Sequence, residues 1–118
     1  MAWTVQIADE FESEFKELDE EISDAIIAKL APLRLEGPNL GRPLADSLYG
    51  SKHSNMKELR FAAGDGEWRV AFAFDPQRKA ILLVAGDKSG VSETKFYKEL
   101  IRKADSRFDA HLARLKGR

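Results

Sequence analysis

The 118-residue chain contains no cysteine and only two histidines. The absence of cysteine excludes disulfide bonds, thiolate metal sites and a cysteine nucleophile, and it fits a reducing cytoplasm. His53 lies in a polar segment and His111 in a charged one, without the spacing of metal ligands. Neither is placed for a serine–histidine–acid site. We therefore expect no metal and no small-molecule cofactor.

Long hydrophobic runs are also missing. No segment approaches the length of a membrane span, and the N-terminus lacks the basic start and apolar stretch of a signal peptide. We therefore expect a cytoplasmic protein with no membrane partner. The length fits one domain, residues 1–118, and 43% hydrophobic residues suffice for a core without disulfide or metal support.

Basic residues are scarce in the first third of the chain. Residues 1–36 carry ten acidic and three basic side chains, a net charge of −7, whereas the remainder carries 16 basic and 10 acidic ones, a net charge of +6. This asymmetry favours a polyanionic partner for the later part. The same charge distribution also fits ordinary solvated helix faces, so sequence motifs are needed to choose between the two interpretations.

The first third predicts a strand and a helical hairpin. Residues 3–7 alternate apolar and polar side chains, as in a half-buried strand. Asp9, with Glu12 three residues later, is typical of a helix N-cap. Pro32 should kink the second helix or end it early. The apolar face of this second helix is expected to contain Ile22, Ala25, Ile26, Leu30 and Leu33.

The rest of the chain predicts a meander and a last helix. Residues 37–54 are rich in turn formers, and we expect one short helical turn at 44–48. Strands over 56–61 and 68–74 flank a glycine-rich hairpin turn. A third strand, 80–85, is apolar on both faces, and Ser92 caps the last helix. Its apolar face contains Phe96, Leu100, Ala104, Phe108 and Leu115.

The predicted order is therefore β-α-α-β-β-β-α. It indicates an α+β domain in which an antiparallel sheet is covered on one face by an N-terminal helical hairpin and a C-terminal helix.

Two arginines are candidate ligands for a phosphate. Strand alternation places Arg60 and Arg69 on the same face of the hairpin, where like charges destabilise a sheet. Ala71 and Ala73 would form a shallow floor beside them. Alternatively, each arginine pairs with a neighbour such as Glu58 or Glu67 and only keeps the sheet soluble.

Two further candidates follow the last strand. Lys88 lies in a glycine-rich loop that lacks the spacing of a Walker phosphate loop, and the alternative is a plain turn. Tyr97 follows the core residue Phe96, so its hydroxyl should lie at the edge of the core, where packing is the alternative role.

The motifs that carry a family resemblance are GPNLGRPL at 37–44, NMKELR at 55–60, WRVAF at 68–72, and GDK at 86–88 followed by Phe96 and Tyr97. In this order they resemble the HigB-type, phage-related branch of the RelE/ParE toxin superfamily, over most of the chain. The resemblance implies a compact sheet with two N-terminal helices. It also implies a ribosome-dependent mRNA endoribonuclease of a type II toxin–antitoxin system, neutralised by a helix-turn-helix antitoxin.

The resemblance assigns catalytic roles to Arg60, Arg69, Lys88 and Tyr97, and a weaker RNA-binding role to Lys57. The reaction would be attack of an RNA 2′-hydroxyl on the adjacent phosphate. Arginine suits the stabilisation of phosphate charge but not proton transfer. Lys88 and Tyr97 both remain candidates for moving the protons. The basic residues of the last helix would bind RNA, or else form a solvated face: Lys95, Lys98, Arg102, Lys103, Arg107, Arg114, Lys116 and Arg118.

Two other functions fit the same fold. ParE-like relatives act on DNA gyrase and cut no RNA, and fold alone does not separate the two activities. The basic cluster favours RNA, because a gyrase inhibitor needs no phosphate site. A non-catalytic module that only binds its antitoxin is the third reading.

Overall fold

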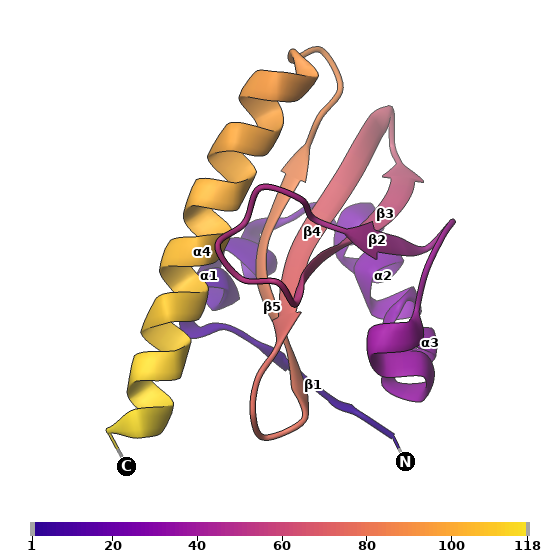
Figure 1. Ribbon diagram of the computed structural model, residues 1–118. Coiled ribbons are helices and arrows are strands. Elements are labelled where there is room, and N and C mark those ends of the chain that lie inside the picture. The colour runs from indigo at the N-terminus through magenta and orange to yellow at the C-terminus, as the bar shows by residue number, and fades with distance from the viewer. Residues whose placement is uncertain (1, 118) are drawn as a thin grey trace.

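A computed structural model describes residues 2–117 of the chain, so Arg118 lies outside the described residues. Its centre is a five-stranded sheet in the order β1-β5-β4-β3-β2 (Figure 1). The strands are β1 (Thr4–Ile7), β2 (Ala45–Ser47), β3 (Met56–Ala63), β4 (Gly66–Phe74) and β5 (Lys79–Asp87). The α+β fold class is confirmed.

The sheet is mixed, whereas an antiparallel sheet was predicted. Strands β3, β4 and β5 form the expected antiparallel meander, but β1 pairs with β5 in parallel, with Val5 opposite Ala80. The helices of the first third connect β1, at one edge of the sheet, to β2, at the other edge. A parallel pair cannot be joined by a tight hairpin, and the connection between β1 and β5 here comprises residues 8–78.

Strand β2 occupies the segment where a short helical turn was predicted, and that prediction is wrong. Its three residues pair antiparallel with β3, with Ala45 opposite Leu59. The flanking backbone continues the pairing, because Arg60 N donates to Leu44 O and Leu48 N donates to Met56 O. Backbone pairing along the edge of β3 satisfies more polar groups than an isolated helical turn would.

Three short helices replace the predicted hairpin of two. They are α1 (Asp9–Glu17), α2 (Glu20–Ala28) and α3 (Leu30–Glu36). Pro32 lies in the first turn of α3 and has no N–H for the carbonyl of Ala28, where α2 ends, so the predicted interruption is confirmed. The predicted cap is wrong, since α1 begins at Asp9 and its N-cap is Ala8, with no side-chain bond.

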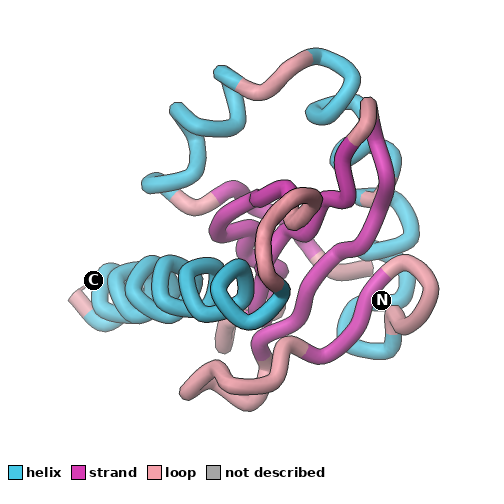
Figure 2. The backbone as a smooth tube through the Cα atoms, turned by 90° about the horizontal axis from the view of Figure 1, so that it is seen from above, coloured by secondary structure: helices cyan, strands magenta, loops and turns pink. Residues whose placement is uncertain are grey.

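The last helix, α4 (Glu93–Lys116), begins as predicted, with Ser92 Oγ accepting from Lys95 N at 3.2 Å. It packs on the opposite face of the sheet from α1 and α2, which corrects the prediction that all helices share one face (Figures 1 and 2). Phe61 marks the α2 face, because Lys29 lies over its ring. Arg69 marks the α4 face, because it bonds to Tyr97. Both faces of the sheet are therefore covered.

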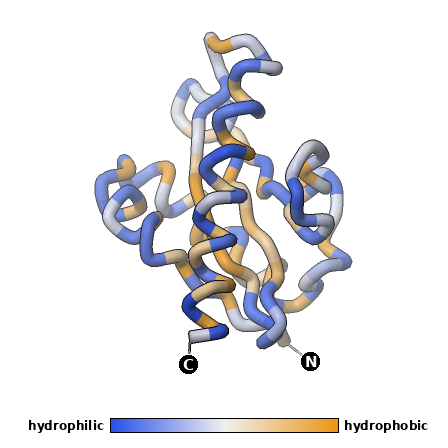
Figure 3. The backbone as a smooth tube through the Cα atoms, turned by 60° about the vertical axis from the view of Figure 1, so that its left-hand side comes forward, coloured by the Kyte–Doolittle hydropathy of each residue, from blue (hydrophilic) through white to orange (hydrophobic). Residues whose placement is uncertain are grey.

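The core lies between these two helical layers. The strands contribute apolar side chains to both faces, with hydrophilic residues frequent in the helices around them (Figure 3). Its largest fully buried side chains are Phe11, Ile26, Leu33, Met56, Leu59, Val70, Phe72, Ile81, Leu82, Leu83 and Phe108. Between residues 2 and 117, no helix is both long and apolar enough to cross a membrane.

Candidate active site

Arg60 and Arg69 lie directly opposite each other in the β3–β4 register, as the alternation predicted. Their environments differ, however. The Arg60 side chain is 22% exposed, whereas Arg69 is buried at 5% exposure because α4 passes over it. The predicted open trough therefore has one accessible arginine and one internal arginine.

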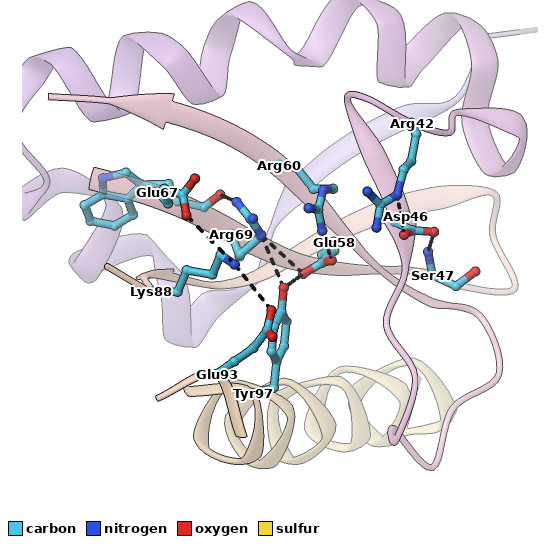
Figure 4. Close-up of polar contacts among 11 residues, drawn as sticks. Arg42, Asp46, Ser47, Glu58, Arg60, Glu67, Arg69, Lys88, Glu93 and Tyr97 are labelled. Atoms are coloured by element: carbon cyan, nitrogen blue, oxygen red, sulfur yellow. Dashed lines mark hydrogen bonds and ion pairs between the residues drawn. The ribbon is translucent and has the colours of Figure 1, made fainter. Parts of the chain in front are cut away.

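Glu58 neutralises the repulsion between the two arginines. It is on the same face as Arg60 and is only 4% exposed. Its Oε2 accepts a 2.8 Å hydrogen bond from Arg60 Nη1, and Arg69 Nε lies 3.9 Å from its Oε1 (Figure 4). The sequence-level alternative, in which an arginine pairs with Glu58, is thus present in the molecule. It accounts for one bond of a larger network.

Tyr97 joins the two halves of that network from α4. Its hydroxyl donates to Glu58 Oε1 at 2.8 Å and accepts from Arg69 Nε at 3.2 Å. Arg69 is fixed further by the bond from its Nη1 to Trp68 O, also 2.8 Å. Each of the four side chains of this cluster, which we call the Glu58 cluster (Glu58, Arg60, Arg69, Tyr97), has at least one hydrogen-bond partner inside the protein.

Gly86 allows Tyr97 to reach Glu58. Gly86 on β5 pairs with Arg69, and the ring of Phe96 on α4 lies against it. A Cβ atom at Gly86 would lie only 2.9 Å from Phe96 Cε1, closer than packed carbon atoms approach. Glycine at this position therefore lets α4 lie close enough to the sheet for the tyrosine hydroxyl to reach the carboxylate.

The environment keeps Tyr97 protonated and Arg60 charged. Burial is the main factor that raises the pKa of Tyr97, and the bond to Glu58 adds to it, while Arg69 opposes it. Burial is the largest single influence and lowers the pKa of Arg60, but the hydrogen bond to Glu58 and the charges of Glu58, Tyr97 and Asp46 together raise it, so the net direction is upward. The Tyr97 hydroxyl is therefore protonated at neutral pH.

The Glu58 cluster opens into a surface pocket of about 320 Å³. This volume is at the lower end for small-ligand sites. Arg42, on the opposite rim, is paired through its Nε with Asp46 Oδ2 at 2.9 Å. The pocket is lined by Arg42, Asp46, Ser47, Leu48, Tyr49, Glu58, Arg60, Glu93 and Tyr97.

Lys88 lies beside the Glu58 cluster without joining it. Its Nζ is 3.3 Å from Glu93 Oε1 and 3.9 Å from Glu67 Oε2 (Figure 4). Because Glu93 also lines the pocket, Lys88 is held at its margin. The structure therefore brings all four predicted catalytic residues to one region, with Lys88 at the edge.

The four predicted RNA-binding residues lie elsewhere. Lys57 is on the other face of β3, and its Nζ donates to Pro38 O and Leu40 O, so it fixes a loop. Lys95, Lys98 and Arg102 are exposed on the outer side of α4, where Arg102 pairs with Glu99. The structure does not bring these four residues into the pocket.

Both histidines are paired with carboxylates. His53 Nε2 lies 2.8 Å from Asp109 Oδ1, and His111 Nε2 lies 2.8 Å from Asp75 Oδ2. Within the described part of the chain, no group of three or more histidine and carboxylate side chains is arranged to hold a metal ion.

Sequence reasoning missed Glu58 as a member of the site. Strand alternation indicates that Glu58 lies on the same face as the arginines. Its near-complete burial, however, depends on α4, which begins 35 residues further along the chain. The signal that could have indicated it is an acidic residue two positions before Arg60, on the face where Tyr97 must also lie.

Three solved structures share this architecture. A mutant of the E. coli toxin RelE in the free state aligns with a TM-score of 0.61 at 13% identity, covering 87% of this chain and 97% of that chain. A chain of the toxin–antitoxin complex RelBE2 from Mycobacterium tuberculosis gives 0.55 at 12% identity, over 74% and 99%. A chain of the RelE–RelB complex from Pyrococcus horikoshii OT3 gives 0.54 at 14% identity, over 77% and 100%. The molecule has a RelE-type fold.

Sequence comparison places the chain within a family. Residues 13–109 match the family described as Phage derived protein Gp49-like (DUF891), and the chain belongs to it. The chain is 44% identical to HigB2 of Mycobacterium tuberculosis over 114 residues, which are 96% of this chain and 56% of that protein. It is 41% identical to HigB3 of the same organism over 99 residues, which are 84% of each.

Both relatives are named as toxins. Their similarity confirms the resemblance to the HigB branch of the RelE/ParE superfamily. The chain spans only about half the length of HigB2, at 56%, so what that whole protein does is not transferred with the fold.

Proposed function

We propose that this chain is the toxin of a type II toxin–antitoxin pair and that it cleaves mRNA on the ribosome. The observation that carries the proposal is the Glu58 cluster at the wall of an open pocket, with an accessible arginine and a protonated tyrosine. The toxin names of HigB2 and HigB3 support the same function.

Arg60 is the proposed ligand of the reacting phosphate. Its Nη1 is bound to Glu58, and the guanidinium has further N–H donors on the exposed part of the side chain. A guanidinium held in one orientation stabilises the charge that develops on phosphate oxygens. Lys88, between two carboxylates at the margin, would add positive charge as the phosphate enters.

Glu58 and Tyr97 are the proposed groups that move protons. The 2′-hydroxyl gives its proton to Glu58 as its oxygen attacks the adjacent phosphorus, and the bond from phosphorus to the 5′-oxygen breaks. Tyr97 gives its proton to that leaving oxygen, so the products are a cyclic phosphate and a 5′-hydroxyl. The raised pKa of Tyr97 supports this direction, since it favours the protonated form. Arg69 positions the tyrosine hydroxyl.

The proposed partners are the ribosome with its mRNA and an antitoxin with a helix-turn-helix domain. The RelE–RelB and RelBE2 structures, which are toxin–antitoxin complexes of other proteins, support a protein partner for this fold. Residues 1–118 would act as one domain in the cytoplasm, where mRNA is translated.

A translation extract tests the proposal. A reporter mRNA is followed by primer extension with wild type, with Arg60→Ala, and with Arg34→Ala as the matched control. Arg34 is an exposed arginine on α3, outside the pocket and outside the basic residues predicted to bind RNA. We expect codon-phased cuts with wild type and Arg34→Ala, and a cleavage rate about 100- to 1,000-fold lower with Arg60→Ala, the loss seen when one charge-stabilising donor is removed.

Two results would overturn the proposal. Intact mRNA with continued translation would exclude the nuclease, and a gyrase supercoiling assay would then test the ParE-like reading. Equal cleavage by wild type and Arg60→Ala would place the activity outside the Glu58 cluster.

A further inference from the structure

Tyr49 is the most exposed large apolar side chain of the described residues, at 84% exposure, and it lines the same pocket as the Glu58 cluster. Single exposed apolar side chains are normal on protein surfaces. Leu35 on α3, at 75%, is an example outside this pocket. What distinguishes Tyr49 is its place on the rim of a polar pocket and the way its backbone is held.

The backbone is fixed on both sides of Tyr49. On one side, the buried Leu48 donates its N–H to Met56 O at 3.0 Å. On the other, Gly50 turns the chain with φ of 98°, a conformation that favours glycine. The loop then meets α4, where Ser51 Oγ and Lys52 N donate to the two carboxylate oxygens of Asp105.

A second anchor on α4 holds the end of the same loop. Lys52 Nζ and His53 Nε2 contact the two oxygens of Asp109, and His53 packs edge-on against Phe108 with ring centroids 4.9 Å apart. The phenol ring is therefore presented to solvent by a backbone attached to the core and to α4. An exposed aromatic on a fixed backbone loses little freedom when a flat ligand stacks on it.

The surroundings of Tyr49 select the ligand class. Arg42 and Arg60 line the same pocket as Tyr49, and their guanidinium groups can bind phosphates. Asp46 accepts from Arg42 Nε and from Ser47 N, and the remaining lone pairs of its carboxylate are available to an exocyclic amino group. Aromatic rings beside cations are the usual means of holding single-stranded nucleic acid, because each base stacks while each phosphate is neutralised.

We propose that Tyr49 is a stacking platform for a nucleobase of single-stranded RNA, next to the phosphate that Arg60 binds. This inference rests on the proposed RNA cleavage and adds a base subsite to it. Stacking at Tyr49 would fix one nucleotide of the strand beside the reacting phosphate and turn its 2′-hydroxyl toward Glu58.

An NMR titration tests the subsite directly. The chain has two tyrosines, Tyr49 and Tyr97, so labelled tyrosine rings give two sets of signals. The probe is a 2′-O-methyl trinucleotide, which lacks the attacking hydroxyl and stays intact. We expect the Tyr49 ring signals to move upfield and to saturate at millimolar trinucleotide. An unmoved Tyr49 ring, with or without shifts at Tyr97, would overturn the inference.

Matched variants separate stacking from a structural role. Tyr49→Phe keeps the ring and should bind the trinucleotide within about twofold of wild type. Tyr49→Ala should raise Kd roughly 5- to 150-fold, the loss typical of one stacked base. Leu35→Ala removes a comparably exposed side chain away from the pocket and should leave Kd unchanged. Equal Kd values for Tyr49→Ala and wild type would contradict the inference.

The titration and the mRNA assay fail independently. If wild type leaves translated mRNA intact, the proposed nuclease is wrong, whereas the titration still judges base stacking. If wild type and Tyr49→Ala cut mRNA at the same rate and the same positions, the nuclease stands and the subsite is wrong.

Discussion

Helix α4 covers two buried polar clusters, one near each of its ends. Tyr97 belongs to the first and His111 to the second, 14 residues apart on the helix, or about 21 Å along its axis. Glu58 and Asp75, the carboxylates at their centres, are 4% and 5% exposed. Burial therefore does not distinguish the two clusters.

In the cluster around Asp75, both carboxylate oxygens have hydrogen-bond partners within the fold. Asp75 Oδ2 is 2.8 Å from His111 Nε2, and its Oδ1 accepts from Gln77 N at 2.9 Å and Lys79 N at 3.0 Å. These bonds fix the β4–β5 turn to α4. Asp75 also lines a surface pocket, of about 330 Å³, but no lysine or arginine is among the residues that line it, whereas Arg60 is bound directly to Glu58 in the other cluster.

The Glu58 cluster includes a cation that reaches solvent. Arg60 is partly exposed, and both Glu58 and Tyr97 border the pocket of about 320 Å³. The two clusters therefore differ in a cation with spare donors at the pocket, and the proposed function depends on this feature. Substitutions in the two clusters should therefore separate activity from stability.

The largest effect is expected from Tyr97→Phe. The change removes the hydroxyl that joins Glu58 and Arg69 and keeps the ring in place. If Tyr97 donates the proton to the leaving oxygen, the rate of mRNA cleavage should fall about 100- to 10,000-fold. The free energy of unfolding should fall by about 2 kcal/mol, because two hydrogen bonds to buried partners are lost, and thermal unfolding measures this change. Cleavage at the wild-type rate would exclude Tyr97 as the proton donor.

Asp75→Ala should have the opposite profile. It leaves two backbone N–H groups and His111 without their acceptor, so the free energy of unfolding should fall by about 3 kcal/mol. Denaturant unfolding measures the loss. Cleavage per folded molecule should stay at the wild-type rate below the unfolding transition. A specific loss of activity in the folded protein would mean that the two clusters are coupled through α4.

The smallest effect concerns a surface ion pair between α4 and α1. Arg107 on α4 bonds to both oxygens of Glu14, and this bond is the main cause of the lowered pKa of Glu14, against the opposing effect of burial. A lowered pKa in the folded state stabilises the protein above the ordinary glutamate value of 4.5, and this is lost as pH falls through the folded value.

Arg107→Met should therefore remove part of the pH dependence of unfolding. Between pH 6 and pH 3, wild type should lose more stability than the variant, by less than about 1 kcal/mol because Glu14 is partly exposed. Denaturant melts at several pH values measure this. Parallel curves for the two proteins would show that the pair contributes nothing measurable.

The strands with clear alternation and the glycine-rich turn were predictable from sequence. The β3–β4 hairpin and its Arg60–Arg69 pairing follow from local pattern, as does the start of α4 at Ser92. The parallel pairing of β1 with β5 was not predictable, because it depends on contacts between residues more than 70 positions apart. Strand β2 has only three residues, too few for a periodic signal.

The site divides in the same way. Alternation identified which strand residues share a face, the loop and helix after the last strand supplied Lys88 and Tyr97 as candidates, and the resemblance assigned roles to all four. The burial of Arg69 and Glu58 could not be predicted, since it results from α4 packing over that face and not from any feature of β3 or β4 themselves.

The close approach at Gly86 has a consequence for how this site tolerates change. Gly86 has no side chain, yet it sets the distance between β5 and α4 and therefore the geometry of the polar groups between them. A lineage that gained a methyl group there would keep every reacting side chain and still shift the hydroxyl away from the carboxylate. A search for inactive relatives would count such a chain as active if it compared only the polar residues of the site.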